Sequence, residues 1–356
     1  MTTPADLNPP SRQGVPHALL LLLALPFLLL AVDPAWLHTG IGRRDSWIYH
    51  SYFLDLPGML RLHPDDYYSS RLAITLPGWL LHRLLPAEAA SLALHLAVWY
   101  AIVLGLWRTL LAAAGPRAAL LAALVAGTQG FVLVGASSNY IDGFGPAFFL
   151  LATACIAQAS VSRPRLRLAL AGACACALVV VNILFVLLLP LLALFALVMV
   201  RHRLSGAAWA AAGGLAAFAA FALASKSLGG RWHFLAPSLA FASSGAAQAA
   251  IQSDKLRVRE WLPQAGYLVL PAAAGLGALL SLAFRRPARA GAFFQFQALA
   301  LLALLAAMQR LPSFSLLQWW FYPVALLFPA SRLALGAQWR GLLDGLPPRA
   351  FAAACL

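Results

Sequence analysis

Charged residues, and acidic residues above all, are scarce in this sequence. Only 10% of its 356 residues are charged, 11 are acidic and two are lysines. An average soluble domain carries about 25% charged residues. Hydrophobic residues make up 62% of the chain, and the mean hydropathy is +0.81. This composition excludes an ordinary soluble fold.

The motifs of several large enzyme classes are also missing. The sequence has no phosphate-binding lysine loop, no GxSxG elbow, no HExxH and no complete GxGxxG. No basic run alternates with aromatic residues, so no nucleic-acid partner is predicted. No cofactor is predicted either. The four cysteines lack zinc-ligand spacing, and three of them lie in apolar segments: Cys155, Cys174, Cys176 and, outside those segments, Cys355.

Long apolar runs recur along the chain and predict an all-α polytopic membrane protein with about ten spanning helices. The run from Leu166 to Val200 holds Asn182 near its middle. This run predicts either a tight hairpin of two short helices or one long helix. The predicted spans are residues 15–32, 89–112, 117–136, 144–160, 167–181, 183–200, 205–225, 265–284, 291–309 and 317–335.

The distribution of charge predicts the orientation of these helices. With the N-terminus inside, the inner segments hold 14 basic and two acidic residues, and the outer segments hold 11 basic and nine acidic residues. Basic residues favour the cytoplasmic side. We therefore expect an integral membrane protein with both termini in the cytoplasm. Its expected parts are a disordered N-terminus (1–14), one transmembrane domain (15–335) with outer loops at 33–88, 137–143 and 226–264, and a tail (336–356).

The first outer loop is the richest in acidic residues, since five of the 11 fall between Asp33 and Asp66. Asp45 follows the first helix closely and has aromatic neighbours such as Tyr49. A carboxylate in such surroundings can serve as a general base. The alternative is a solvated aspartate that pairs with an adjacent arginine, Arg43 or Arg44.

Two further acidic motifs lie in the predicted outer segments. Asp142, in the sequence NYIDG, is either a second catalytic carboxylate or the N-cap of the next helix. His63, Asp65 and Asp66, in the sequence HPDD, suggest either weak binding of a divalent metal or a turn with Asx hydrogen bonds around Pro64. The spacing of this trio matches no known metal site, so the turn is favoured.

Basic and aromatic residues of the outer segments are candidates for binding an anionic substrate. Arginine can bind a phosphate group through two hydrogen bonds, and contact with lipid headgroups is the alternative role. The stretch from Arg71 to Leu85 is apolar but short and contains Pro77 and Gly78, which predicts an interfacial or re-entrant helix. The predicted substrate-binding residues are Arg71, Arg231, Lys255, Arg257, Tyr49 and Tyr140.

The order of these features resembles the GT-C superfamily of polyprenyl-phosphate-dependent glycosyltransferases. It looks most like bacterial relatives of protein mannosyltransferases and aminoarabinose transferases. The matching segments are DSWIYHSYF with Asp45, YYSSRLAITLPGWLLHRLL, and NYIDG with Asp142, within residues 15–160. The chain departs from the family in having Asp45-Ser46 where an Asp-Glu pair is common, and in lacking a His-Pro-Pro element.

The resemblance implies a transferase of the bacterial inner (plasma) membrane, in the cell envelope, that moves a sugar from a polyprenyl-phosphate donor to an acceptor on the outer face of this membrane. Asp45 would deprotonate the acceptor, and outer basic residues would hold the phosphate. The alternatives are a lipid or small-solute transporter or flippase, and a non-catalytic assembly subunit. A transporter needs ionisable residues at mid-membrane, whereas His95 and Asn182 are the main polar residues in the predicted spans.

Overall fold

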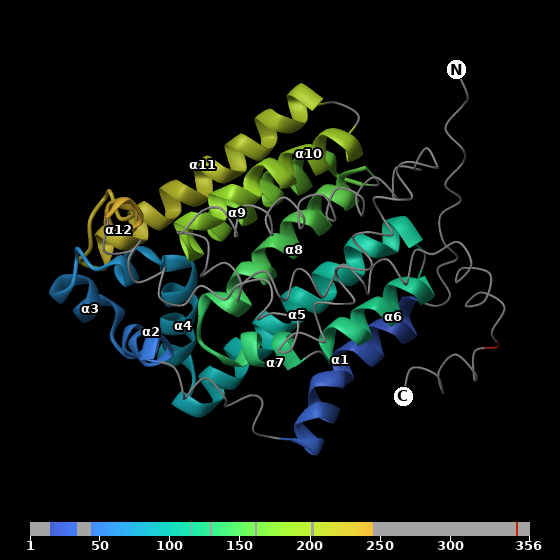
Figure 1. Ribbon diagram of the computed structural model, residues 1–356, viewed down its shortest axis with the longest axis horizontal. Helices are drawn as coiled ribbons and strands as arrows, with labels where there is room; N and C mark the ends of the chain where they lie inside the picture. Colours follow the sequence, from blue (N-terminus) through green and yellow to red (C-terminus); the bar gives the residue numbers. More distant parts are fainter. Residues whose placement is uncertain are drawn as a thin grey trace, which may run out of the picture.

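The computed structural model confirms the all-α class for the residues that it describes, because every regular element among them is a helix (Figure 1). The predicted spans beyond residue 264, the two termini, Lys255 and Arg257 lie outside the described residues. The described residues are 15–33, 44–114, 116–128, 130–160, 162–200, 203–244 and 347.

Four of the described helices are long and apolar enough to cross a membrane. A helix satisfies its own backbone hydrogen bonds, which is the condition for crossing hydrocarbon. These helices fit an integral membrane protein. They are α5 (Ala87–Ala114), α8 (Ile141–Ala159), α9 (Pro164–Val181) and α11 (Arg203–Ser227). The first helix, α1 (Val15–Val32), contains a shorter apolar stretch.

The single helix predicted over 117–136 is wrong. The chain forms two shorter helices there, α6 (Pro116–Gly127) and α7 (Gly130–Ser137). Trp99 of α5 donates a hydrogen bond from its indole nitrogen to the carbonyl oxygen of Gly127 over 3.0 Å. This hydrogen bond satisfies a carbonyl group at the end of α6. A hydropathy pattern does not reveal such a contact between distant residues.

Asn182 separates two helical segments, so the alternative of one long helix is also wrong. Its backbone is extended, and its side-chain oxygen accepts a hydrogen bond from the backbone nitrogen of Leu184 over 3.0 Å. It thereby caps η5 (Ile183–Leu188), which leads into α10 (Leu189–Met199). Pro190 occupies the first turn of α10, where its missing N–H costs no helical hydrogen bond.

Helix α8 packs against α5 and α9, and α9 packs in turn against α11. Small residues bring α9 and α11 into close backbone contact. A Cβ atom added at Gly172 would overlap the carbonyl oxygen of Ala210, and one added at Gly213 would overlap that of Ala169. Reciprocal small residues of this kind allow two helices to approach closely in a membrane.

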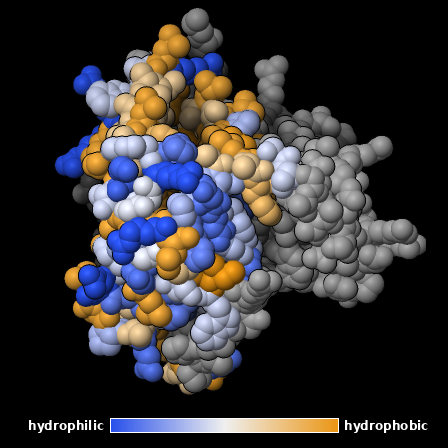
Figure 2. All heavy atoms as spheres, turned by 90° about the vertical axis from the view of Figure 1, so that its left-hand side faces the viewer, coloured by the Kyte–Doolittle hydropathy of each residue, from blue (hydrophilic) through white to orange (hydrophobic). Residues whose placement is uncertain are grey.

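One end of the bundle, called the polar end here, is built from short helices between α1 and α5 and from α12 (Figure 1). Hydrophilic side chains gather on this end of the molecule (Figure 2). Helix α12 lies against η4. The elements of the polar end are α2 (Arg44–Leu54), α3 (Leu56–Leu62), η4 (Tyr67–Ser70), α4 (Leu72–Leu84) and α12 (Ala236–Ser243).

Helix α4 agrees with the short helix predicted from Arg71 to Leu85, and it continues through Pro77. It packs against α2, α5 and α9. A Cβ atom at Gly78 would overlap the ring of Phe53 of α2, so the absence of a side chain permits this approach. Leu80 and Leu84 on the same helix are exposed. The helix therefore has one face in the protein and an apolar face outside it.

Candidate functional site

Helix α2 carries Asp45 in its first turn and buries Tyr49, Tyr52 and Phe53 further along. Spacings of three and four residues place side chains on one face of a helix. Ser46 donates a hydrogen bond from its hydroxyl group to the carbonyl oxygen of Ser138. This bond ties the start of α2 to the segment that precedes α8.

Tyr68 donates a hydrogen bond from its hydroxyl group to Oδ1 of Asp45 over 2.8 Å. The 3₁₀ helix η4 positions this tyrosine, and Asp66 caps η4 by accepting a hydrogen bond from the Tyr68 backbone nitrogen over 3.2 Å. Asp45 is half-buried. The bond occupies one of its carboxylate oxygens and leaves Oδ2 outside that interaction. The predicted pairing with Arg43 or Arg44 lies outside the described side chains.

Arg71 is buried, with 6% of its surface exposed, and it is enclosed by tyrosines. Its guanidinium group donates a hydrogen bond to the hydroxyl oxygen of Tyr49. The guanidinium carbon lies 4.6 Å from the ring centroid of Tyr67 and 5.7 Å from that of Tyr68. Such positions allow cation–π attraction. The Nε atom has no hydrogen-bond partner among the described residues.

The tyrosines around Arg71 do not neutralise its charge. Burial raises the pKa of Tyr49, of Tyr68 and of Tyr140 well above the ordinary value of 10.0, so their hydroxyl groups stay protonated at neutral pH. No ion pair joins Arg71 to a carboxylate in the part of the chain that the structure describes. A buried charge without an opposite partner is costly. The surroundings of Arg71 thus suit an anionic group from outside these residues.

Asp142 lies in the first turn of α8 and is not its N-cap, because Tyr140 holds that position. The predicted capping role is therefore wrong, although a carboxylate in the first turn still interacts favourably with the helix dipole. The ring of Tyr140 lies 5.8 Å from that of Tyr49. Burial has the largest effect on the pKa of Tyr140 and raises it. The charge of Arg71 lowers this pKa, whereas the charges of Asp45 and Asp142 raise it.

The polar end thus brings together five of the residues predicted from the sequence. Tyr140 links these residues, because the charges of Asp45, Asp142 and Arg71 all act on its hydroxyl group. We call this set, with Tyr68 added, the Arg71 cluster. Its members are Asp45, Tyr49, Tyr68, Arg71, Tyr140 and Asp142.

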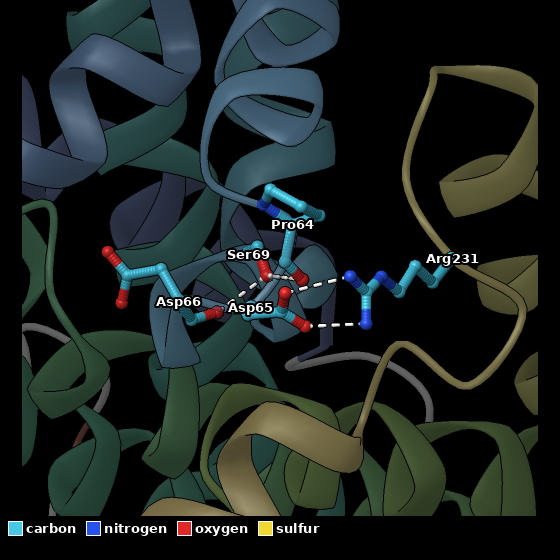
Figure 3. Close-up of polar contacts among 5 residues, drawn as sticks. All are labelled: Pro64, Asp65, Asp66, Ser69 and Arg231. Carbon is cyan, nitrogen blue, oxygen red and sulfur yellow. Dashed lines mark hydrogen bonds and ion pairs between the residues drawn. The ribbon is translucent and has the colours of Figure 1, made fainter.

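Arg231, one of the residues predicted to bind the substrate, is part of an ion pair at the surface. It forms an ion pair with Asp65, with distances of 2.7 and 2.8 Å between its terminal nitrogens and the carboxylate oxygens (Figure 3). The side chains are 45% and 67% exposed. The pair joins the segment before η4 to the segment before α12. Arg231 therefore fastens two surface segments together at the polar end.

The HPDD segment is a turn, as favoured by its sequence. Ser69 donates hydrogen bonds to the carbonyl oxygens of Pro64 and Asp66, over 3.3 and 2.6 Å (Figure 3). Asp66 accepts the Asx-type hydrogen bond described above. No group of three or more histidine, cysteine or acidic side chains suited to a metal occurs among the described residues. The alternative of a metal at His63, Asp65 and Asp66 therefore finds no support.

Tyr67 and Tyr68 are site residues that the sequence does not reveal. Two adjacent tyrosines beside a membrane helix have the pattern of interfacial aromatic residues. Their positions depend on the η4 turn, which places the Tyr67 ring under Arg71 and directs the Tyr68 hydroxyl group to Asp45.

Comparison with protein-family models, with curated proteins and with solved structures gives no match.

Proposed function

We propose that the protein is a membrane glycosyltransferase that takes a sugar from a polyprenyl-phosphate donor, as in the GT-C superfamily. The observation that carries this proposal is the Arg71 cluster. A buried guanidinium group that forms no ion pair with a carboxylate of the described residues lies beside a half-buried carboxylate, and Tyr68 contacts both. An anionic leaving group and a proton acceptor are the two requirements of this reaction.

The proposed reaction assigns a role to each charged residue. Oδ2 of Asp45 accepts the proton of the acceptor hydroxyl or amino group as that group attacks the anomeric carbon of the sugar. The bond between this carbon and the phosphate oxygen breaks, and polyprenyl phosphate leaves with the electron pair. Arg71 stabilises the negative charge on the phosphate through its guanidinium group. The phosphate is a good leaving group, so no general acid is needed.

Asp142 is the second carboxylate of the proposed site. It is 93% buried at the start of α8 and acts electrostatically on Tyr140. We assign it an electrostatic role at the acceptor side of the site, beside Tyr140. Tyr140, which is partly exposed, supplies its hydroxyl group and ring face to the donor sugar, and the buried Tyr49 holds Arg71 in place through its hydroxyl group.

An Asp45→Asn variant tests the role of the base. The amide is nearly isosteric and keeps an oxygen that accepts the hydrogen bond from Tyr68. In an assay with purified protein and a polyprenyl-phosphate sugar extracted from bacterial membranes, turnover should fall by about 100-fold or more. Donor binding should persist. Equal turnover of the wild type and the variant would remove Asp45 from the mechanism.

Two arginine variants test the phosphate site with a matched control. Arg71→Gln should weaken donor binding, because it removes the buried cation. Arg231→Gln should leave donor binding unchanged, since the ion pair with Asp65 accounts for this exposed residue. Donor binding to wild type without any sugar transfer, combined with movement of the lipid between leaflets, would instead favour the flippase. Loss of binding in Arg231→Gln alone would move the phosphate site away from Arg71.

A further inference from the structure

Arginines gather where α9 and α11 begin, at the end of the bundle opposite the polar end. Arg165, in the first turn of α9, lies over the ring of Trp209, in the second turn of α11. A Cβ atom at Gly206 of α11 would lie 3.2 Å from the side chain of Leu168 of α9. The two helices therefore begin side by side, and α11 runs from there toward α12 at the polar end (Figure 1). The arginines at these two helix starts are Arg163, Arg165, Arg167 and Arg203.

The charge of these arginines is not balanced by nearby carboxylates. Arg167 donates hydrogen bonds to Oε1 of Gln158 and, over 3.0 Å, to the carbonyl oxygen of Ser162, so it holds the turn between α8 and α9. The other three arginines are exposed, and no ion pair joins them to a carboxylate among the described residues. The sequence from 143 to 244 contains no acidic residue. This end of the bundle is therefore complementary in charge to an anionic partner.

Exposed apolar side chains lie beside the arginines. Leu166 and Leu170 are exposed on α9, and their spacing of four residues places them on one face of the helix. Leu204 and Trp209 are exposed on α11. The guanidinium carbon of Arg165 lies 5.9 Å from the ring centroid of Trp209. Tryptophan rings at the ends of membrane helices lie at the level of the lipid headgroups, and arginine side chains extend along apolar surface toward the same level.

We propose that Arg163, Arg165, Arg203 and Trp209, together called the arginine surface, bind the headgroup of an anionic phospholipid. Arginine binds a phosphate group through two hydrogen bonds, and basic clusters beside membrane helices recognise anionic headgroups. The exposed leucines of both helices contact the acyl chains of the same lipid, whereas an acidic soluble protein would have no match for them. The lipid holds the starts of α9 and α11 together. The proposal is independent of the glycosyltransferase reaction, because the Arg71 cluster lies at the other end of the bundle.

Lipid titration of the purified protein in detergent tests this site. The protein is titrated with phosphatidylglycerol or with phosphatidylcholine of the same acyl chains, and native mass spectrometry measures the bound lipid. The wild type should bind phosphatidylglycerol at least about tenfold more tightly than phosphatidylcholine. Each of Arg163→Gln, Arg165→Gln and Arg203→Gln should reduce this preference by about fivefold, the contribution typical of one basic residue near an anionic surface. The triple glutamine variant should lose the preference, and the triple lysine variant should keep most of it, since it keeps the charge.

Arg231→Gln is the matched control, because it removes one exposed arginine at the polar end, where Asp65 already balances the charge. It should keep the preference of the wild type. Equal binding of the two lipids by the wild type would overturn the proposal, and so would an unchanged preference in the triple glutamine variant. A separate arm replaces the lipid with inorganic phosphate and measures the melting temperature. Phosphatidylglycerol alone should raise it, whereas an equal rise with inorganic phosphate at the same concentration would assign the surface to free anions and overturn the lipid site.

Discussion

Tyr68 and Asp45 are 23 residues apart in the chain and are joined by a hydrogen bond of 2.8 Å. The bond connects η4 to the first turn of α2. Tyr68 also lies under the guanidinium group of Arg71. A single phenol therefore couples the position of the proposed base to the position of the proposed phosphate ligand.

Removing this hydroxyl group in Tyr68→Phe should destabilise the protein by about 1–2 kcal/mol. A hydrogen bond to a charged group contributes about 1.5–3 kcal/mol, and the half exposure of Asp45 places the loss near the lower limit. Thermal unfolding in detergent measures the effect. Tyr52→Phe is the matched control, because this buried hydroxyl group has no hydrogen-bond partner among the described residues. Equal destabilisation by both substitutions would contradict the importance of the bond.

Alkaline pH should destabilise the protein through its buried tyrosines. Burial raises the pKa of Tyr49, Tyr52, Tyr68 and Tyr140 above the ordinary 10.0. Their contribution to stability is complete below pH 10 and is lost as the pH rises from 10 toward the raised values, since the unfolded chain releases these protons first.

Ultraviolet absorbance of tyrosinate and the melting temperature together measure this effect. Of the eight tyrosines, only the accessible ones should titrate near pH 10 in the folded protein, and the rest should ionise together with unfolding. The melting temperature should fall steadily above pH 10. Titration of all eight tyrosines near pH 10 without unfolding would contradict the burial of the Arg71 cluster.

Hydropathy predicts α1, α5, α8, α9 and α11 to within a few residues of their bounds, because the length of an apolar run is a local property of the sequence. At the break between α6 and α7, the carbonyl oxygen of Gly127 accepts a hydrogen bond from Trp99, which is 28 residues away in the chain. Contacts of that kind leave no periodic pattern. The same reason explains why one span was predicted where two helices exist.

The candidate site divides in a similar way. Asp45 and Arg71 are conspicuous in the sequence, since charged residues are rare in it and both lie close to apolar segments. The structure adds the partners, which are not visible in the sequence. Tyr68 binds Asp45, whereas Arg231 is held by Asp65 at the surface. Residue type and position in the sequence identify the candidate site residues, but only the tertiary fold shows which arginine is buried.

Gly213 and Gly214 offer a test of the α9–α11 contact with adjacent residues. A Cβ atom at Gly213 would overlap the carbonyl oxygen of Ala169, whereas one at Gly214 would lie 3.4 Å from the carbonyl oxygen of Gly172, an ordinary contact. Gly213→Ala should therefore lower the stability by about 1–3 kcal/mol, the cost typical of overpacking. Gly214→Ala should be neutral or slightly stabilising, because alanine favours helix. Thermal unfolding measures both variants. A lower melting temperature for Gly214→Ala than for Gly213→Ala would refute the close contact.

Cysteine labelling tests which side of the membrane the polar end faces. In a background without the four native cysteines, single cysteines replace Leu62 at the end of α3, Trp232 before α12 and Ser162 before α9, all of them exposed positions. The ion pair between Asp65 and Arg231 requires the first two positions to be on the same side. A membrane-impermeant maleimide added to intact cells should label both of them.

Ser162→Cys should react only after the membrane is permeabilised. Its neighbours Arg163, Arg165 and Arg167 form a basic cluster, and such clusters are retained in the cytoplasm. Helices α8 and α9, which flank this position, are each long and apolar enough to separate it from the polar end. Labelling of Ser162→Cys in intact cells, with Leu62→Cys protected, would invert the orientation. The Arg71 cluster would then face the cytoplasm, where a donor on the outer leaflet does not reach it.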